Sequence, residues 1–351
     1  FGNPLLAFTI YRVACFAAIY LLILRCISKY KPHWFLAIFC ISLMAVFTAN
    51  TLSSRAELLS MALNSWVFYF LLNQKKLTNT VAISLILLMV IWSNWHITAA
   101  LGFVTIGAFY IQQVYTNRTK PKESQRIVIF GVMTFLAGFC VANFSHPLLS
   151  ILVGFEDFSI FVPETRALTY WGSNHAAHSV LFVGLLALVL AINQRNIMIS
   201  LVLSSVLLQT LSHEKLFLHL IPLIIVTLTF FNKEILKYCA FPRFGKYFII
   251  LAIGILCFNF FDIAKNIGAL TKRVPLGYLS ANYEHALIPY ELDDYIKEKQ
   301  LKGNVLNSYV AGGYLSYKHW PKIKVFIDGR VNIFYDRDFS PKYFSASHHP
   351  T

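Results

Sequence analysis

Polar residues interrupt the apolar stretches of this chain at three places, and their types suit the binding of a phosphate group. Arg55 and Glu57 lie at the first place, and Arg55 offers a planar fork of donors that fits a phosphate. The same two residues could instead form an ion pair at a membrane surface, with the long Arg side chain reaching toward water. Their position in the sequence does not separate the two interpretations.

The second interruption is Trp92-Ser93-Asn94-Trp95-His96, which contains the amide of Asn94 and the imidazole of His96. Polar groups at membrane depth are costly and tend to be functional, so Asn94 and His96 are candidate substrate contacts. His96 could also be a hydrogen-bonded structural residue, and a metal ligand is the weakest option because no ligand set accompanies it. Trp92 and Trp95 fit the amphipathic aromatic residues found at membrane interfaces.

The third interruption is Ser212-His213-Glu214-Lys215, and His219 follows one helical turn later. Lys215 is a candidate point charge for a phosphate, and Glu214 or His213 is a candidate acid or base. The alternative is a solvated turn between two helices. Lys215 therefore joins Arg55 and Asn94 as a predicted substrate-binding residue.

The residues do not identify a catalytic base. Glu57, His96 and Glu214 are the candidates, because each could accept a proton near the predicted phosphate contacts. Glu156 and Asp157 form a further acidic pair in a long loop, where they could hold a divalent cation, act as acid and base, or simply be solvated. No other cofactor and no metal site is implied.

The composition is that of a membrane protein. Of the 351 residues, 57% are hydrophobic and only 13% are charged, which departs far from a soluble globular mixture. A helix that spans a bilayer needs roughly 20 mainly apolar residues, and the chain offers about ten apolar stretches. They are Leu5–Ile27, Trp34–Asn50, Leu58–Leu72, Val81–Trp92, Thr98–Val114, Ile127–Phe144, Val180–Ile192, Ile197–Leu211, Leu216–Phe231 and Tyr247–Ile263. We therefore expect an all-α polytopic transmembrane helix bundle.

The basic residues lie in alternate loops between these stretches, which predicts that those loops face the cytoplasm. The clusters are Arg25/Lys29/Lys31, Lys75/Lys76, Arg118/Lys120/Lys122/Arg126, Arg195 and Lys233/Lys237/Arg243/Lys246. Asp157, Glu214 and Asp328 then lie on the exported side. The formal net charge of +14 does not indicate nucleic acid as a partner, because no basic face interleaved with aromatic residues is present.

The six cysteines have no metal-ligand spacing, and none lies in the polar C-terminal part of the chain. We expect them to be small core residues. They are Cys15, Cys26, Cys40, Cys140, Cys239 and Cys257.

A change of composition after Ala264 marks a domain boundary. Residues 1–264 form the predicted helix bundle, and residues 265–351 form a small exported α/β domain that is predicted to be incomplete. Pattern and turn signals predict a helix, a strand, a helical turn and a second strand in a β-α-β arrangement. Their ranges are Pro289–Gln300, Asn304–Tyr309, Ala311–Tyr317 and Lys322–Asp328.

Asp328 and Arg330 are candidate binding residues of the α/β domain. The run Val325-Phe326-Ile327 predicts a buried strand, and Asp328 follows at its C-terminal end, where sites of α/β proteins form. The alternative is that Asp328 caps a turn and pairs with Arg330.

The sequence resembles a group of bacterial multi-spanning proteins related to the GT-C class of membrane glycosyltransferases. The resemblance extends from about Arg55 to Tyr335. It rests on Arg55 and the span after it, Trp92-Ser93-Asn94-Trp95-His96, the segment from Lys215 to Pro222, Gly312-Gly313-Tyr314-Leu315, Pro321, and Val325-Phe326-Ile327-Asp328-Gly329-Arg330.

The resemblance implies a GT-C-like fold in the bacterial cytoplasmic (inner) membrane. Enzymes of this class transfer a sugar from a polyprenyl-phosphate donor at the exported face, with an acidic residue of the first exported loop as base. No residue of this chain matches that acid. Two other functions use the same features: a lipid or solute transporter or flippase would use the polar groups as a path, and a non-catalytic scaffold would bind an envelope partner through the C-terminal domain.

The chain is also expected to be a fragment of a longer protein. Orientation by the basic loops places Phe1 outside, and the first residue is not Met. A preceding span and exported loop would supply the missing acid, and the strand Lys322–Asp328 is followed by too little chain to complete a buried sheet.

Overall fold

The computed structural model describes residues 4–51, 57–95, 98–140, 175–212, 216–239, 254, 290–307 and 309–327. The chain divides into two compact units, Phe1–Gly268 and Ala269–Thr351. We call them the helical unit and the C-terminal unit. The sequence alone places the boundary after residue 264.

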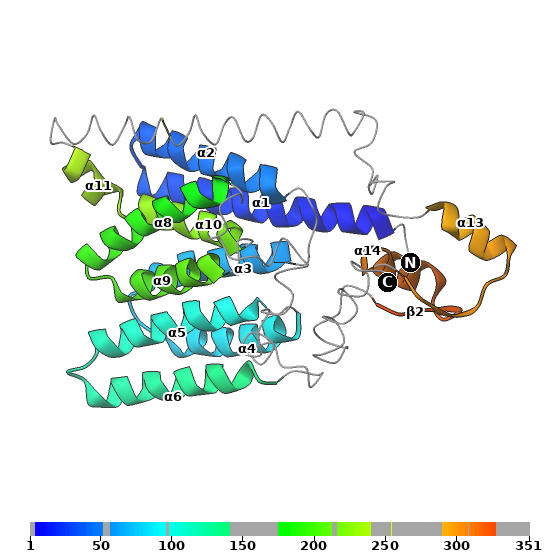
Figure 1. Cartoon of the computed structure of the whole chain (residues 1–351). Coiled ribbons are helices and arrows are strands. Elements are labelled where there is room, and N and C mark those ends of the chain that lie inside the picture. Colours follow the sequence, from blue (N-terminus) through cyan, green and yellow to red (C-terminus); the bar gives the residue numbers. More distant parts are fainter. Residues whose placement is uncertain are drawn as a thin grey trace. The chain divides into compact units, whose positions relative to one another are not determined.

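Long helices make up the described part of the helical unit (Figure 1). They are α1 (Pro4–Tyr30), α2 (Trp34–Thr51), α3 (Glu57–Leu72), α4 (Asn79–Trp95), α5 (Ala99–Thr116), α6 (Pro121–Ala137), α8 (His175–Asn193), α9 (Ile197–Ser212), α10 (Phe217–Phe230) and the short α11 (Asn232–Cys239). Each predicted apolar stretch except the last coincides with one of the longer helices. The last, Tyr247–Ile263, lies outside the described residues apart from residue 254.

Several of these helices, among them α4 and α6, extend beyond the predicted stretches. Helix α4 continues through Ser93 and Asn94, so these polar residues belong to its last turn. Helix α6 begins at Pro121, six residues before the apolar run, because proline suits the first turn of a helix and the polar residues after it are tolerated there. Apolar runs locate such helices but do not mark their polar ends.

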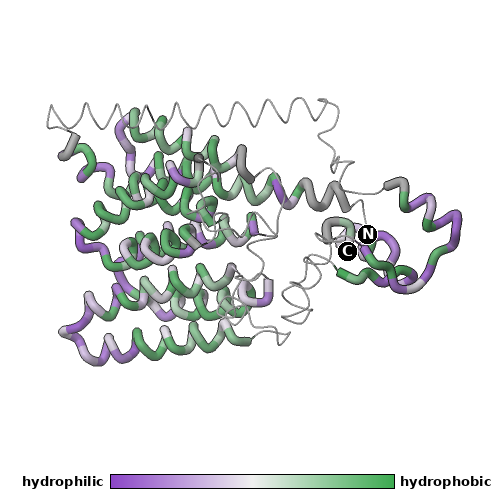
Figure 2. Tube along the Cα trace, viewed as in Figure 1, coloured by the Kyte–Doolittle hydropathy of each residue, from purple (hydrophilic) through white to green (hydrophobic). Residues whose placement is uncertain are grey.

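One described helix segment, Ile10–Tyr30 of α1, is long and apolar enough to cross a membrane by length and composition. The other apolar helices are shorter. Several nevertheless carry exposed apolar side chains along their outer sides, as on α4, where Ile83, Leu87 and Ile91 are spaced one turn apart. Figure 2 shows hydrophobic positions along these helices and hydrophilic positions gathered at their ends.

The fully buried helix α10 is the centre of the helical unit. Every residue from Phe217 to Thr229 is buried, because α1, α2, α3, α8 and α9 pack around it. A helix that is apolar all round is stable only when it is covered on all sides. The helices pack so closely at Gly184 of α8 that a larger residue would not fit without a shift. An added Cβ would lie 2.9 Å from Leu207 Cδ2 of α9 and 3.0 Å from Leu220 Cδ2 of α10.

Hydrogen bonds join helix ends at one end of the unit, which we call the basic end. Tyr30, the last residue of α1, donates to Asn73 Oδ1 just after α3 at 3.0 Å, and Lys29 donates to the same oxygen. The backbone N–H of His33, before α2, donates to Asn232 Oδ1 after α10 at 3.1 Å. The ends of α1, α3 and α10 and the start of α2 therefore lie together.

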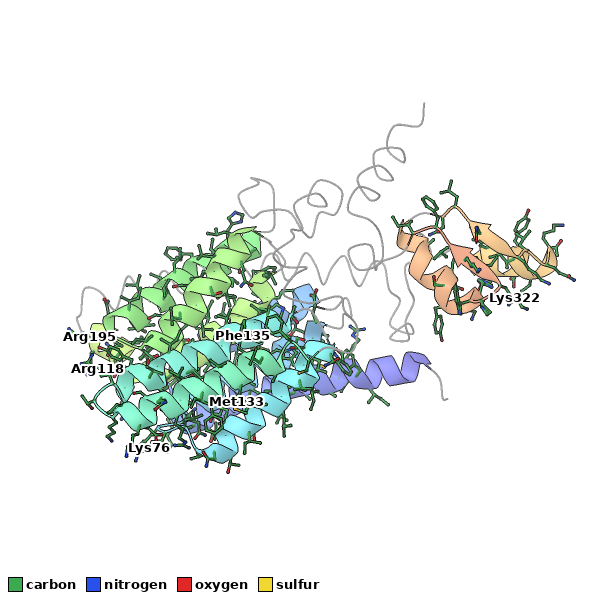
Figure 3. The ribbon with its side chains drawn as sticks, turned by 90° about the horizontal axis from the view of Figure 1, so that it is seen from below. Lys76, Arg118, Met133, Phe135, Arg195 and Lys322 are labelled. Atoms are coloured by element: carbon green, nitrogen blue, oxygen red, sulfur yellow. The ribbon has the colours of Figure 1, made fainter. Side chains whose placement is uncertain are left out.

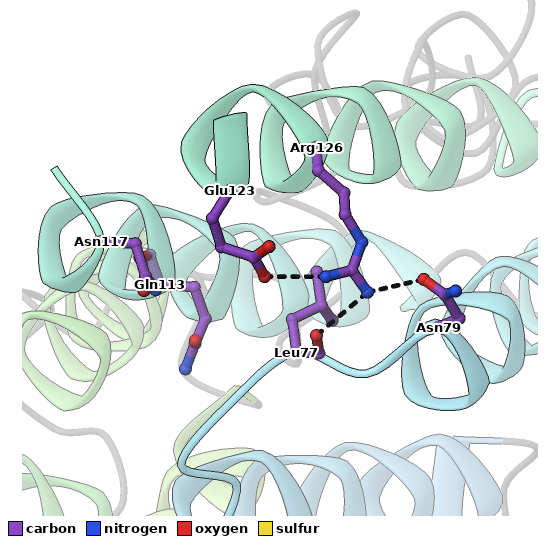
Figure 4. A network of polar contacts seen from close by, with 6 residues as sticks. All are labelled: Leu77, Asn79, Gln113, Asn117, Glu123 and Arg126. Carbon is purple, nitrogen blue, oxygen red and sulfur yellow. Dashed lines mark hydrogen bonds and ion pairs between the residues drawn. The ribbon is translucent and has the colours of Figure 1, made fainter. Parts of the chain in front are cut away.

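Further hydrogen bonds at the basic end join the start of α6 to the start of α4 and the end of α5 to the start of α9. Figure 4 shows the contacts around Arg126 of α6. Arg126 of α6 donates to Asn79 Oδ1 at 2.6 Å and forms an ion pair with Glu123 at 2.8 Å. Met198 N, at the start of α9, donates to Gln112 Oε1, near the end of α5, at 3.2 Å. Neighbouring helices in the chain thus alternate in direction.

Lysine and arginine gather at the basic end. Figure 3 shows Lys76, Arg118 and Arg195 together there, whereas Met133 and Phe135 lie along the side of α6. Apart from Arg12, the Lys and Arg residues described in the helical unit lie in the connections of this end, in the last two turns of α1, in the start of α6 or in α11. They are Arg25, Lys29, Lys31, Lys75, Lys76, Arg118, Lys120, Lys122, Arg126, Arg195, Lys233 and Lys237.

The C-terminal unit contains the predicted β-α-β order, but its strands are shorter than predicted and Tyr309 begins the helix rather than ending the first strand. Its described elements are α13 (Tyr290–Glu298), β1 (Gly303–Val305), α14 (Tyr309–His319) and β2 (Ile323–Val325). The strands are parallel, with Gly303 opposite Ile323 and Val305 opposite Val325. A small core of Ile296, Ala311, Leu315 and Ile323 joins the helices to the strands.

A buried carboxylate ties α13 to α14. Asp293 accepts hydrogen bonds from Tyr314 Oη at 2.5 Å and from His319 Nε2 at 2.6 Å. Burial by itself raises the pKa of Asp293, but the hydrogen bonds from Tyr314 and His319 outweigh it, so its pKa lies below the ordinary value. The charged form of Asp293 therefore stabilises the contact between the two helices.

Replacing Asp293 by Ala should loosen α13 from α14 by about 3 kcal/mol, because two hydrogen bonds to a charged acceptor are lost. In wild-type protein, ionised Asp293 stabilises the contact between α13 and α14 above its unfolded pKa of about 3.9. This stabilisation is lost as the pH falls through the pKa of Asp293 in the folded protein, which is lower. Amide hydrogen exchange of α13 and α14 in the full chain measures both effects. Equal protection in wild type and Asp293→Ala at neutral pH would contradict this role, and Asp293→Asn, which keeps an acceptor, should lose less.

Candidate functional site at the opposite end of the bundle

Two of the predicted site residues lie among the described residues, namely Glu57 and Asn94. The others lie outside them: Arg55, His96, Glu214, Lys215, Asp328 and Arg330. The acidic pair Glu156 and Asp157 is also outside, as is His213. The described helices nevertheless fix where the connections that carry four of these residues, Arg55, His96, Glu214 and Lys215, start and end.

The start of α3 and the end of α4 meet at the end of the unit away from the basic residues, which we call the opposite end. Trp92 Nε1 of α4 donates to Ser60 Oγ of α3 at 3.0 Å, and both side chains are buried. The backbone N–H of Leu59 donates to Tyr11 Oη of α1 at 3.3 Å, which satisfies one of the free donors at the start of α3. The first turn of α3 and the last turn of α4 therefore lie together at this end.

Helices α9 and α10 also meet at the opposite end. Helix α9 starts at the basic end beside the end of α5 and packs along α5, so Ser212 lies toward the start of α5. Helix α10 ends at the basic end and therefore begins, at Phe217, at the opposite end. Three connections, between α2 and α3, α4 and α5, and α9 and α10, are thus anchored at one end of the bundle.

Asn94 acts as a tie between helices. Its Nδ2 donates to Val90 O in its own helix at 2.7 Å and to Cys140 O, just after α6, at 2.8 Å. Both amide hydrogens are therefore committed within the protein. Glu57 is the first residue of α3 and is partly buried, a position where the helix dipole favours a negative charge.

Trp92 does not occupy a membrane interface, contrary to the sequence prediction. Its exposed fraction is 0%, because it lies on the inner side of α4, whereas Trp95 has an exposed fraction of 55%. The Trp92 ring packs so closely on α5 that a Cβ added at Gly102 would lie 2.7 Å from Trp92 Cζ3. One residue thus contacts α3 through a hydrogen bond and α5 through its ring.

A group of buried polar residues around Trp92 could not be recognised from the sequence alone. Thr105 Oγ1 of α5 donates to Asn64 Oδ1 of α3 at 2.8 Å, and both residues are buried. Asn64 Nδ2 and Ser93 Oγ have no hydrogen-bond partner among the described residues. The available signal was Ser60 and Asn64, two polar residues one turn apart within an otherwise apolar helix.

The described residues offer no group of three or more His, Cys, Asp or Glu side chains that could hold a metal ion. Cys15, Cys26 and Cys40 are buried, as predicted, but Cys140 is exposed because the chain leaves α6 before it. The side chains of Cys239 and Cys257 are outside the described residues. His219 is buried in the first turn of α10, at the opposite end.

Comparison with models of known families, with curated proteins and with solved structures finds no match to this chain.

Replacing Gly102 by Ala should destabilise the bundle by about 1–3 kcal/mol, because the new methyl group would force the Trp92 ring off its contact with α5. Gly107 is a matched control in the same helix, since an added Cβ there meets no atom within 4 Å. Gly107→Ala should be neutral or stabilising by up to about 1 kcal/mol. Thermal unfolding in detergent micelles compares the two variants, and equal midpoints would show that the packing of Trp92 does not limit stability.

Proposed function

We propose that the chain is a multi-spanning membrane protein related to the GT-C class, which takes a sugar from a polyprenyl-phosphate donor at the exported face of a bacterial inner membrane. The opposite end of the bundle would bind the donor phosphate, with Arg55 and Lys215 as its cationic partners. The observation that carries the proposal is that the connections holding Arg55, His96 and Lys215 are all anchored at this one end.

The outer surface of the helical unit supports the membrane location. Helix α6 exposes Val128, Val132 and Phe135 along one side, and α8 exposes further large apolar side chains. Monomeric soluble proteins rarely expose contiguous apolar surface of this kind, and a lipid environment removes its cost. Most of the helices are short for a span, which tilting or local thinning of the bilayer would accommodate.

The distribution of charge supports the orientation. Basic residues gather at one end, where the described acids Glu123 and Glu234 are few in comparison. Positively charged loops stay on the cytoplasmic side of a membrane. The opposite end would then face the exported side, where lipid-linked sugars are the donors of this class.

The chemistry requires three things from the opposite end. Cations at headgroup depth would stabilise the phosphate, and the apolar flanks of the bundle would accept the isoprenoid tail. A carboxylate would take the proton of the acceptor hydroxyl. The hydroxyl oxygen would at the same time bond to the anomeric carbon of the sugar, and the phosphate would leave with the electrons of the broken bond. Glu57 and Glu214 are the carboxylates of this chain nearest in sequence to the cationic residues, and the class resemblance adds an acid from an earlier exported loop.

Arg55→Ala and Lys215→Ala should each weaken binding of a polyprenyl-phosphate sugar by about 1.5–3 kcal/mol, or roughly ten- to a hundredfold, because each removes a charge-assisted hydrogen bond. Arg195→Ala is the matched control, since this exposed cation lies at the basic end. Binding is measured in nanodiscs, together with transfer of labelled sugar to an added acceptor.

Full affinity in both variants would contradict the proposed phosphate site. Binding of the donor by wild-type protein without any transfer would instead favour a flippase. Absence of donor binding by wild-type protein would favour a solute transporter or a scaffold.

A further inference from the structure

Asn64 is a buried amide without a complete set of partners in the interior of the bundle. It has an exposed fraction of 1%, and its Oδ1 accepts a hydrogen bond from Thr105 Oγ1 at 2.8 Å. Its Nδ2 has no hydrogen-bond partner among the described residues. Exchanging the oxygen and nitrogen of the amide would only move the unpaired atom to the oxygen, so one end of Asn64 stays unsatisfied either way.

Asn64 lies about one helical turn further from the opposite end than Trp92. Ser60 and Asn64 are one turn apart on α3, and Gly102 and Thr105 are one turn apart on α5. Trp92 contacts Ser60 and Gly102, so its ring lies one turn nearer the opposite end than the Asn64–Thr105 pair. Ser93, the next residue after Trp92, is also buried and its Oγ is unpaired among the described residues.

Unpaired polar groups are rarely kept in a protein interior, and those that persist require an explanation such as a ligand or an ordered water. The groups here are neutral, namely an amide, hydroxyls and an indole N–H. Neutral donors in apolar surroundings suit neutral oxygen atoms, whereas a phosphate calls for cations. A sugar ring carries several neutral oxygens that can both donate and accept hydrogen bonds.

We infer that Asn64 and Ser93 bind hydroxyl groups of the donor's sugar ring, with Ser93 beside Trp92 and Asn64 one turn further inside the bundle. This inference rests on the proposed function and assigns the sugar-recognition part of that site. Trp92 lies one turn nearer the opposite end than Asn64, and its indole N–H donates to Ser60 Oγ.

The test compares two ligands in nanodiscs, a polyprenyl phosphate carrying one neutral hexose and the same polyprenyl phosphate without the sugar. Asn64→Leu keeps the side-chain volume but removes the amide, and it should weaken binding of the sugar-bearing lipid about ten- to a hundredfold. Binding of the sugar-free lipid should stay unchanged. Ser93→Ala should give a loss in the same direction.

Ser65→Ala is the matched control. Ser65 follows Asn64 and is also buried, but its hydroxyl donates to Met61 O in its own helix at 2.6 Å. This variant should bind both lipids as wild type does. Thermal unfolding of ligand-free Asn64→Leu should change little, because removing an unpaired donor from the interior offsets the loss of the hydrogen bond from Thr105.

The outcomes separate the inference from the proposed function. If Asn64→Leu binds both lipids normally, the amide holds an internal water only and the inference is overturned. If it binds both lipids equally poorly and unfolds at a lower temperature, Asn64 is structural and the inference is again overturned. If wild-type protein binds neither lipid, the proposed function itself fails and the inference fails with it.

Discussion

Polar groups inside the helical unit must find partners within the protein, because the sides of its helices are apolar both inward and outward. Most charged and many polar side chains therefore lie at the helix ends, where Arg126 donates to Asn79 and Tyr30 donates to Asn73. This constraint also explains why the interior tolerates α10, whose side chains are mostly apolar over their whole circumference. A bundle built in this way has two chemically active surfaces, one at each end.

The two ends differ in how they are held. The basic end is closed by several side-chain hydrogen bonds between helices that are distant in sequence. At the opposite end, Trp92 joins α3, α4 and α5, and Asn94 joins α4 to the chain after α6. Around Trp92 some buried polar groups lack hydrogen-bond partners among the described residues, namely Asn64 Nδ2 and Ser93 Oγ. Departures of this kind tend to occur at functional positions.

The positions of the long helices and the β-α-β order could be predicted from sequence, because apolar runs and turn residues are local signals. The extension of α4 through Asn94 could not be predicted, because a polar residue in the last turn of a helix resembles the start of a loop. Only the structure shows that Asn94 donates a hydrogen bond to Cys140 O. The burial of Trp92 was also missed, because a tryptophan near a helix end fits an interface as well as a core. Asn64 escaped notice because its meaning depends on Thr105, which is far from it in the chain.

Single-cysteine accessibility in a cysteine-free background tests the central claim most directly, namely that the two ends of the bundle lie on opposite sides of a membrane. Lys76, Arg195, Trp95 and His178 are exposed positions that lie two at each end. We expect K76C and R195C to react with a membrane-impermeant thiol reagent only from the cytoplasmic side, and W95C and H178C only from the exported side. Reaction of all four from the same side, or the reverse assignment, would contradict it.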